Sequence, residues 1–100
     1  MYQGNPILES SVSVQMLLTT KRALNNAKAK VNYHTKMGNM FANKMREVVD
    51  KDGALMDKVM FSSLRKSHNH HIKKAQQFES IVEKLTEDLT DIRLSMGLIK

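Results

Sequence analysis

The feature that most constrains this chain is a seven-residue pattern of core positions that runs through two long segments. In the first segment, positions a and d begin at Leu17 and Thr20 and recur every seven residues as far as Val48. In the second, the pattern runs from Ala54 to Ile99 and is mostly apolar. Heptads sustained over this length are typical of helices that pack as a coiled coil.

The two segments are joined by residues 49–53, which carry the strongest turn signal in the chain because Asp-Lys-Asp-Gly combines residues that favour turns. We therefore predict a single all-α domain of 100 residues, a long antiparallel helical hairpin completed by oligomerisation. Its predicted parts are an irregular N-terminal arm at 1–13, helices at about 14–48 and 54–96, and a turn at 49–53. A three-helix bundle broken at 37–39 or 67–71 is the alternative, although the heptad crosses both places without a change of phase.

A five-residue turn would also determine which core residues face each other across the hairpin. The predicted partners are Gly38 with Leu64, His34 with His68, and Ala27 with Ala75. Small residues would then face small ones or leave room for large ones, as close packing requires.

Three of the four histidines, His34, His68 and His71, fall at core positions, and His70 is expected to point away from them. Three imidazoles and a water can form an open zinc or copper site. A polar layer that fixes the register explains the same pattern without a metal, and a pH-responsive switch is a third interpretation. We expect no cofactor, with zinc or copper at these histidines as the alternative.

Two apolar surfaces are left without a partner in the predicted hairpin. At the C-terminal end, the second heptad continues opposite an arm that has no matching apolar row, and near the turn methionines occupy more than the inner face. Unpaired apolar stripes and flexible methionines are typical of docking surfaces. The candidate partner-binding residues are Leu85, Leu89, Ile92, Met96 and Ile99 at the C-terminal end and Met37, Met40, Met56 and Met60 near the turn.

The net charge of +6 is concentrated in the middle of the chain, where residues 21–74 hold thirteen Lys and Arg against four Asp and Glu. Basic stripes on helices can neutralise phosphates. The candidate phosphate-binding residues are Lys28, Lys36, Arg65, Lys66, Lys73 and Lys74. The chain has no recognisable nucleic-acid-binding motif and no Trp for stacking on bases, so nucleic-acid binding is an alternative function rather than the first expectation.

Several classes of protein are not expected. The chain has no cysteine, no basic segment followed by an apolar run at its start, and no apolar stretch of about 20 residues, so we expect no disulfide, secretory signal or transmembrane helix. It has no glycine-rich phosphate loop and no nucleophile elbow, and its acidic residues have the spacing of a solvated helix face, so we expect no enzyme and no small-molecule substrate.

The leading hypothesis is a non-enzymatic structural protein, a small helical subunit that forms a homo-oligomer or docks into a larger complex. Virion, phage and secretion-apparatus components are the kinds of assembly considered. A basic helical nucleic-acid-binding protein and a metal-binding helical bundle are the alternatives. A reducing compartment, either the cytoplasm or the interior of an assembled particle, is the expected location.

Overall fold

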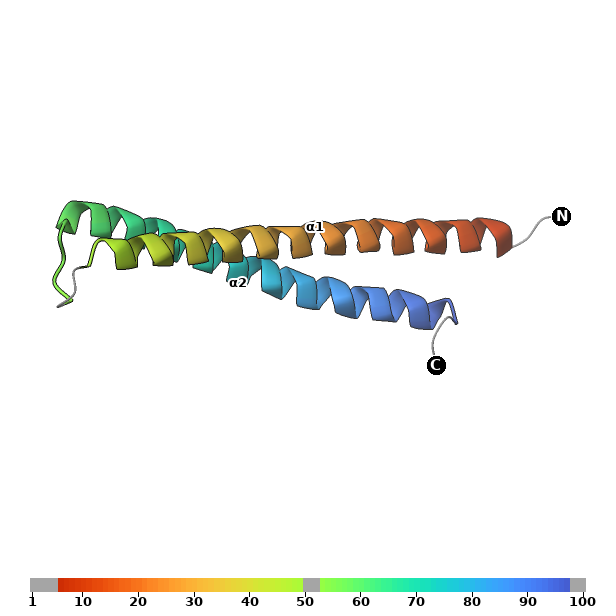
Figure 1. Ribbon diagram of the computed structural model, residues 1–100. Coiled ribbons are helices and arrows are strands. Elements are labelled where there is room, and N and C mark those ends of the chain that lie inside the picture. The colour runs from red at the N-terminus through yellow and green to blue at the C-terminus, as the bar shows by residue number, and fades with distance from the viewer. Residues whose placement is uncertain (1–5, 50–52, 98–100) are drawn as a thin grey trace.

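The computed structural model is a pair of long helices that lie side by side and run in opposite directions (Figure 1). It describes residues 6–49 and 53–97, with side chains from residue 12 onward. Helix α1 spans Pro6–Glu47 and helix α2 spans Lys58–Ser95. At a rise of about 1.5 Å per residue, each helix is roughly 60 Å long. The all-α helical hairpin predicted from the heptads is confirmed.

Helix α1 begins eight residues earlier than predicted, at Pro6 rather than at residue 14. Proline suits the first helical position, because its φ is already helical and its missing N–H would have no partner there. Residues 6–13, predicted as an irregular arm, are therefore helical. The serines of this stretch are poor helix formers, but extending an existing helix adds one hydrogen bond for each residue ordered.

The connection between the helices is ten residues long, residues 48–57, rather than the predicted five. The Met56 N–H donates a hydrogen bond to the Val48 carbonyl over 2.9 Å, and Val49 forms an antiparallel bridge with Leu55. Gly53 has a φ of 81°, a left-handed conformation that glycine adopts without strain. The turn glycine was thus correctly identified, while the extent of the turn was underestimated.

The start of α2 is set by Asp57. This residue is extended, with φ −144° and ψ 102°, and its Oδ1 accepts a hydrogen bond of 2.9 Å from the Met60 N–H. An N-terminal cap of this kind satisfies an amide that has no partner within the helix. Because the cap lies at Asp57, the helix starts at Lys58 and not at Ala54 as predicted.

The longer connection shifts the register of the hairpin by one heptad. A methyl group placed on Gly38 would lie 4.0 Å from Cβ of His71 and 2.9 Å from Cδ1 of Ile72, so Gly38 lies opposite His71 and not opposite Leu64. The predicted pairing of His34 with His68 is also wrong, since His34 contacts His71. A shift of seven residues keeps every a and d position facing the other helix, and for this reason the heptads alone did not reveal it.

The core of the hairpin is thin. Among the described side chains, the buried hydrophobic ones are Leu24, Ala27, Ala75 and Leu89. All four occupy a or d positions, and most other core positions are only half-buried. A pair of helices encloses each core side chain incompletely, because no further layer covers the seam. No helix within the described ranges is apolar over a length that would cross a bilayer.

The cap at Asp57 gives the first prediction. Asp57→Ala should lower the free energy of unfolding by about 0.5–2 kcal/mol, because the Met60 amide loses its acceptor. Urea denaturation followed by circular dichroism measures this loss. Asp91→Ala, on an exposed position inside α2, is the matched control. An equal loss in both variants would contradict the capping role.

The register gives the second prediction. In the shifted register Ala27 lies opposite Val82, so cysteines at these two positions should form an intrachain disulfide under mild oxidation. Cysteines at Ala27 and Ala75 should not, because an offset of seven residues separates them by about 10 Å along the helix axis. Non-reducing electrophoresis and peptide mass spectrometry distinguish the two variants. A disulfide in the second pair and not in the first would restore the register predicted from the sequence.

Candidate interaction surfaces

Two histidines meet in the seam of the hairpin, His34 on α1 and His71 on α2. Their Nδ1 atoms are 2.8 Å apart, and their ring centroids are 5.1 Å apart. A hydrogen bond between these two nitrogens requires a proton on one and a lone pair on the other. At least one of the two rings is therefore neutral when the bond is formed.

Aromatic rings enclose this histidine pair. His34 stacks on Phe78 with centroids 5.8 Å apart, and His71 stacks on Phe41 with centroids 5.7 Å apart. Tyr33 approaches both imidazoles edge-on, at 5.0 Å and 6.1 Å. The histidine pair is thus flanked by rings on several sides, although both imidazoles remain half-buried.

His70 joins this group and His68 does not. The His70 ring lies 5.1 Å from that of His71 and 6.4 Å from that of His34. His70 was predicted to point away, and His68 was predicted to face His34; Nδ1 of His68 instead lies 3.3 Å from Oδ1 of Asn69. The pairing of His34 with His68 failed because the register differs by one heptad, whereas His70 joins the group from a c position, which lies beside the seam in either register.

The predicted metal ligands His34, His68 and His71 are therefore not gathered around a common point. Within the part of the chain that the structure describes, no three His, Asp or Glu side chains are placed to hold a metal ion. Nδ1 of each of these two histidines is directed at Nδ1 of the other. The zinc or copper site stays an untested alternative without geometric support.

The electrostatic surroundings of His34 are basic. Partial desolvation, followed by the charges of His71, His70, Lys74 and Lys30, lowers the pKa of His34 below its ordinary value. Each of these effects disfavours a second positive charge at the seam. The neutral form of His34 is therefore the form that the fold accommodates.

Near the connection, apolar side chains are exposed as predicted. We define the loop-end patch as Leu55, Met56, Val59 and Met60, all of which are exposed. Val59 is 82% exposed and Met56 is 62% exposed, values unusual for large apolar residues in a folded chain. Met37 and Met40, the other two candidates from this end, are half-buried.

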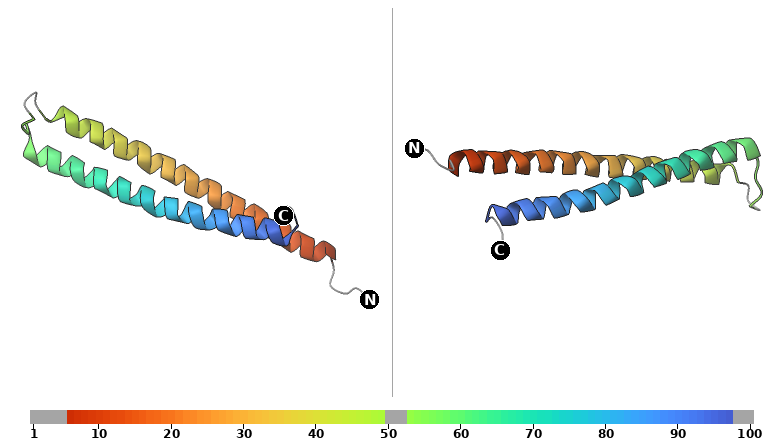
Figure 2. Two further views of the ribbon diagram at one scale, coloured as in Figure 1. Left: turned by 90° about the horizontal axis from the view of Figure 1, so that it is seen from below. Right: turned by 180° about the vertical axis from the view of Figure 1, so that it is seen from behind.

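The C-terminal end of α2 is not the unpaired stripe that the sequence predicted. Leu89 is only 6% exposed, while Leu85, Ile92 and Met96 are half-buried. Ile99 lies outside the described residues. The early start of α1 and the shifted register explain this difference, since α1 runs alongside this end of α2 and projects beyond it (Figures 1 and 2).

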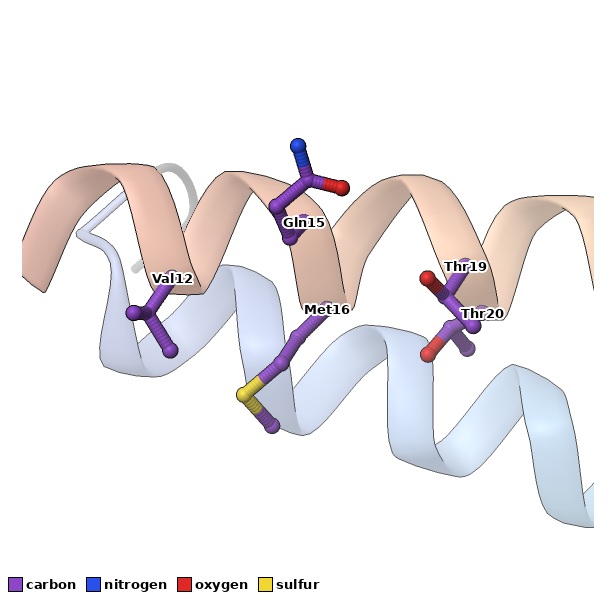
Figure 3. Close-up of a pocket in the computed structure, with 5 residues that line it drawn as sticks. All are labelled: Val12, Gln15, Met16, Thr19 and Thr20. Atoms are coloured by element: carbon purple, nitrogen blue, oxygen red, sulfur yellow. The ribbon is translucent and has the colours of Figure 1, made fainter.

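The exposed apolar residues at this end belong to α1. Val12 and Met16 are each 53% exposed and line a shallow depression with Gln15, Thr19 and Thr20. Figure 3 shows Val12 and Met16 pointing to the same side of α1, while Gln15 points away. The heptads do not predict this surface, because neither apolar residue occupies an a or d position, although their spacing of four residues places them on one helix face.

The candidate phosphate-binding residues are accessible but belong to several faces. Lys28, Lys36, Arg65, Lys66 and Lys73 are exposed, and Lys74 is half-buried. Residues 21–46 of α1 and 58–78 of α2 contain no Asp or Glu, because the four acidic residues of the basic middle region all lie between 47 and 57. Residues 21–46 and 58–78 therefore carry basic side chains and no acidic ones.

Neither a protein-family model, nor a curated protein sequence, nor a solved structure matches this chain.

The histidine pair predicts a dependence of stability on pH. The pKa of His34 is lowered in the folded state, so its contribution is complete above the unfolded-state pKa of about 6.5 and is lost as the pH falls through the lower folded-state value. The free energy of unfolding should thus decrease between about pH 7 and pH 5. His34→Gln should reduce this decrease, and His68→Gln should retain it. A wild-type free energy that stays constant over this interval would contradict the role of the pair.

Proposed function

We propose that this chain is a non-enzymatic helical subunit that self-associates or docks into a larger protein assembly. One observation carries the proposal. The described part of the hairpin has four buried hydrophobic residues but eleven large hydrophobic residues that are exposed. A folded chain with this balance gains most from a partner that covers its exposed side chains.

The size of the gain supports the same conclusion. Burying a large aliphatic side chain contributes about 1.5–3 kcal/mol. The exposed residues lie near both ends of the rod, at Val12 and Met16 and again in the loop-end patch. Covering several of them at once contributes free energy of the same order as the cost of bringing two chains together, which is about 4–15 kcal/mol.

The charge distribution supports nucleic-acid binding as a second candidate function. Helix residues 21–46 and 58–78 lack acidic side chains, and most of the basic side chains there are exposed. A protein that neutralises several phosphates binds nucleic acid with an affinity that falls steeply as salt is added. Aromatic stacking is not a strong addition, because Phe41 and Phe78 already pack on the histidine pair.

Sedimentation velocity of the purified chain, before and after nuclease treatment, tests the proposal. We expect a discrete particle that contains more than one chain, free of nucleic acid and unaffected by nuclease. A heterogeneous particle that nuclease reduces to single chains would favour the second candidate. A single chain at every concentration, with no bound nucleic acid, would contradict the proposed self-association.

A further inference from the structure

We infer that helix α2 carries a binding track for single-stranded nucleic acid, which runs along residues 58–74 and ends beside the exposed ring of Tyr33. This site goes beyond the proposed assembly role and does not depend on it. It gives the second candidate function a location and a form of nucleic acid. Phosphates would lie along α2, and a base would stack next to the histidine pair.

The track consists of two shallow depressions on the surface of α2. The one nearer the connection is lined by Lys58, Val59, Ser62, Ser63 and Lys66. The next one is lined by Lys66, Asn69, His70, Ile72 and Lys73. Because Lys66 lines both, the depressions are continuous along the helix. Ammonium, hydroxyl and amide groups are the ones that proteins direct at phosphate oxygens, and here they extend over about 24 Å of helix.

The charge along this track is of one sign. Residues 58–74 hold five Lys and Arg and no Asp or Glu, and residues 21–46 of α1 hold seven and none. The acidic residues Glu47 and Asp57 lie at the loop end, where the track begins, and Asp57 is engaged with the Met60 amide. Glu79, the next acidic residue of α2, lines a separate depression with Lys28. A phosphate chain along the track is therefore complementary in charge to its surroundings.

At the far end of the track, an aromatic ring is open to solvent. Among the described phenylalanine and tyrosine side chains, Tyr33 is the exposed one, at 54%. Its ring lies 6.1 Å from that of His71, and the ring of His70, which lines the second depression, lies 5.1 Å from the same imidazole. Phe41 and Phe78 are stacked on the histidine pair, so Tyr33 is the ring left for a ligand.

Lysines accompany this ring on both helices. Lys30 and Lys74 both act electrostatically on His34, the neighbour of Tyr33 in the sequence. The Lys30 Nζ lies 5.0 Å from the centroid of the Phe78 ring. Exposed rings beside cationic side chains are typical of sites that bind single strands, because bases stack on the ring while the backbone meets the cations. Bases in a duplex are stacked on each other, so this combination selects a single strand.

An anionic membrane is the other surface that lysines can bind, and the structure favours it less. Helices that lie on membranes combine a basic face with a broad apolar one. The loop-end patch is apolar, but it adjoins residues 47–57, which hold four acidic residues that an anionic membrane would repel. The track itself is lined mainly by polar groups, including Ser62, Ser63 and Asn69.

The experiment measures binding of fluorescently labelled oligo(dT) and oligo(U) to the full chain, freed of nucleic acid, by fluorescence anisotropy at several salt concentrations. Lys66→Gln/Lys73→Gln should bind more weakly. Its slope of log affinity against log salt should fall by about 1.4, since each phosphate contact on a single strand contributes about 0.7. The matched control, Lys28→Gln/Lys36→Gln, changes the charge equally at exposed positions of α1 and should keep the wild-type slope. Equal losses in the two variants would overturn the track.

The stacking site is tested with Tyr33→Ala, which should lower the affinity by roughly 5- to 150-fold without changing the salt slope. Tyr33→Phe keeps the ring and should bind like the wild type, and circular dichroism checks that each variant is folded. Wild-type affinity in Tyr33→Ala, or a duplex bound as tightly as oligo(dT), would overturn the single-stranded site.

Two further outcomes would overturn the inference as a whole. One is a wild type that binds neither oligonucleotide at low salt. The other is binding to phosphatidylserine vesicles without binding to either oligonucleotide, which would favour a membrane. Sedimentation of the chain free of nucleic acid tests the proposed function separately, so the failure of one is distinguishable from the failure of the other.

Discussion

The close approach of α1 and α2 at Gly38 and His71 is the contact on which the rest of this structure depends. It places His34 against His71, brings Leu89 under cover of the hairpin, and leaves α1 projecting beyond α2. Glycine costs about 1 kcal/mol relative to alanine inside a helix. Here the absent side chain leaves the space that Ile72 occupies, so a position unfavourable for α1 alone is favourable for the pair.

The thinness of the seam connects the fold to the proposed function. Two helices bury only a narrow stripe of each other, and Val59 and Met56 remain largely exposed. A chain of this size without disulfides gains stability from further packing. In the proposed assembly a partner would cover these side chains, so association would complete the core as well as serve the function.

Charge and aromatic packing divide the rod into regions with different properties. The histidine pair, enclosed by Phe41 and Phe78, lies in the basic half, where Lys30 and Lys74 oppose its protonation. The acidic residues of α2 begin at Glu79 and lie alongside basic residues of α1 such as Lys28.

The sequence by itself determined the helices, their antiparallel pairing, the seam-facing positions and the exposed loop-end patch, because all of these follow from local periodicity and one turn. Only the tertiary structure decided the register. A slip of one heptad leaves every a and d residue in the seam, so the choice depends on where Asp57 caps α2. That register brings His34 against His71 and, together with the early start of α1 at Pro6, buries Leu89. The early start of α1 also adds the exposed Val12 to the helix, one turn before Met16. The histidine contacts join residues far apart in the sequence, which no local pattern specifies, whereas the cap at Asp57 and the helix start at Pro6 are local features whose effect on the pairing appears only in the structure.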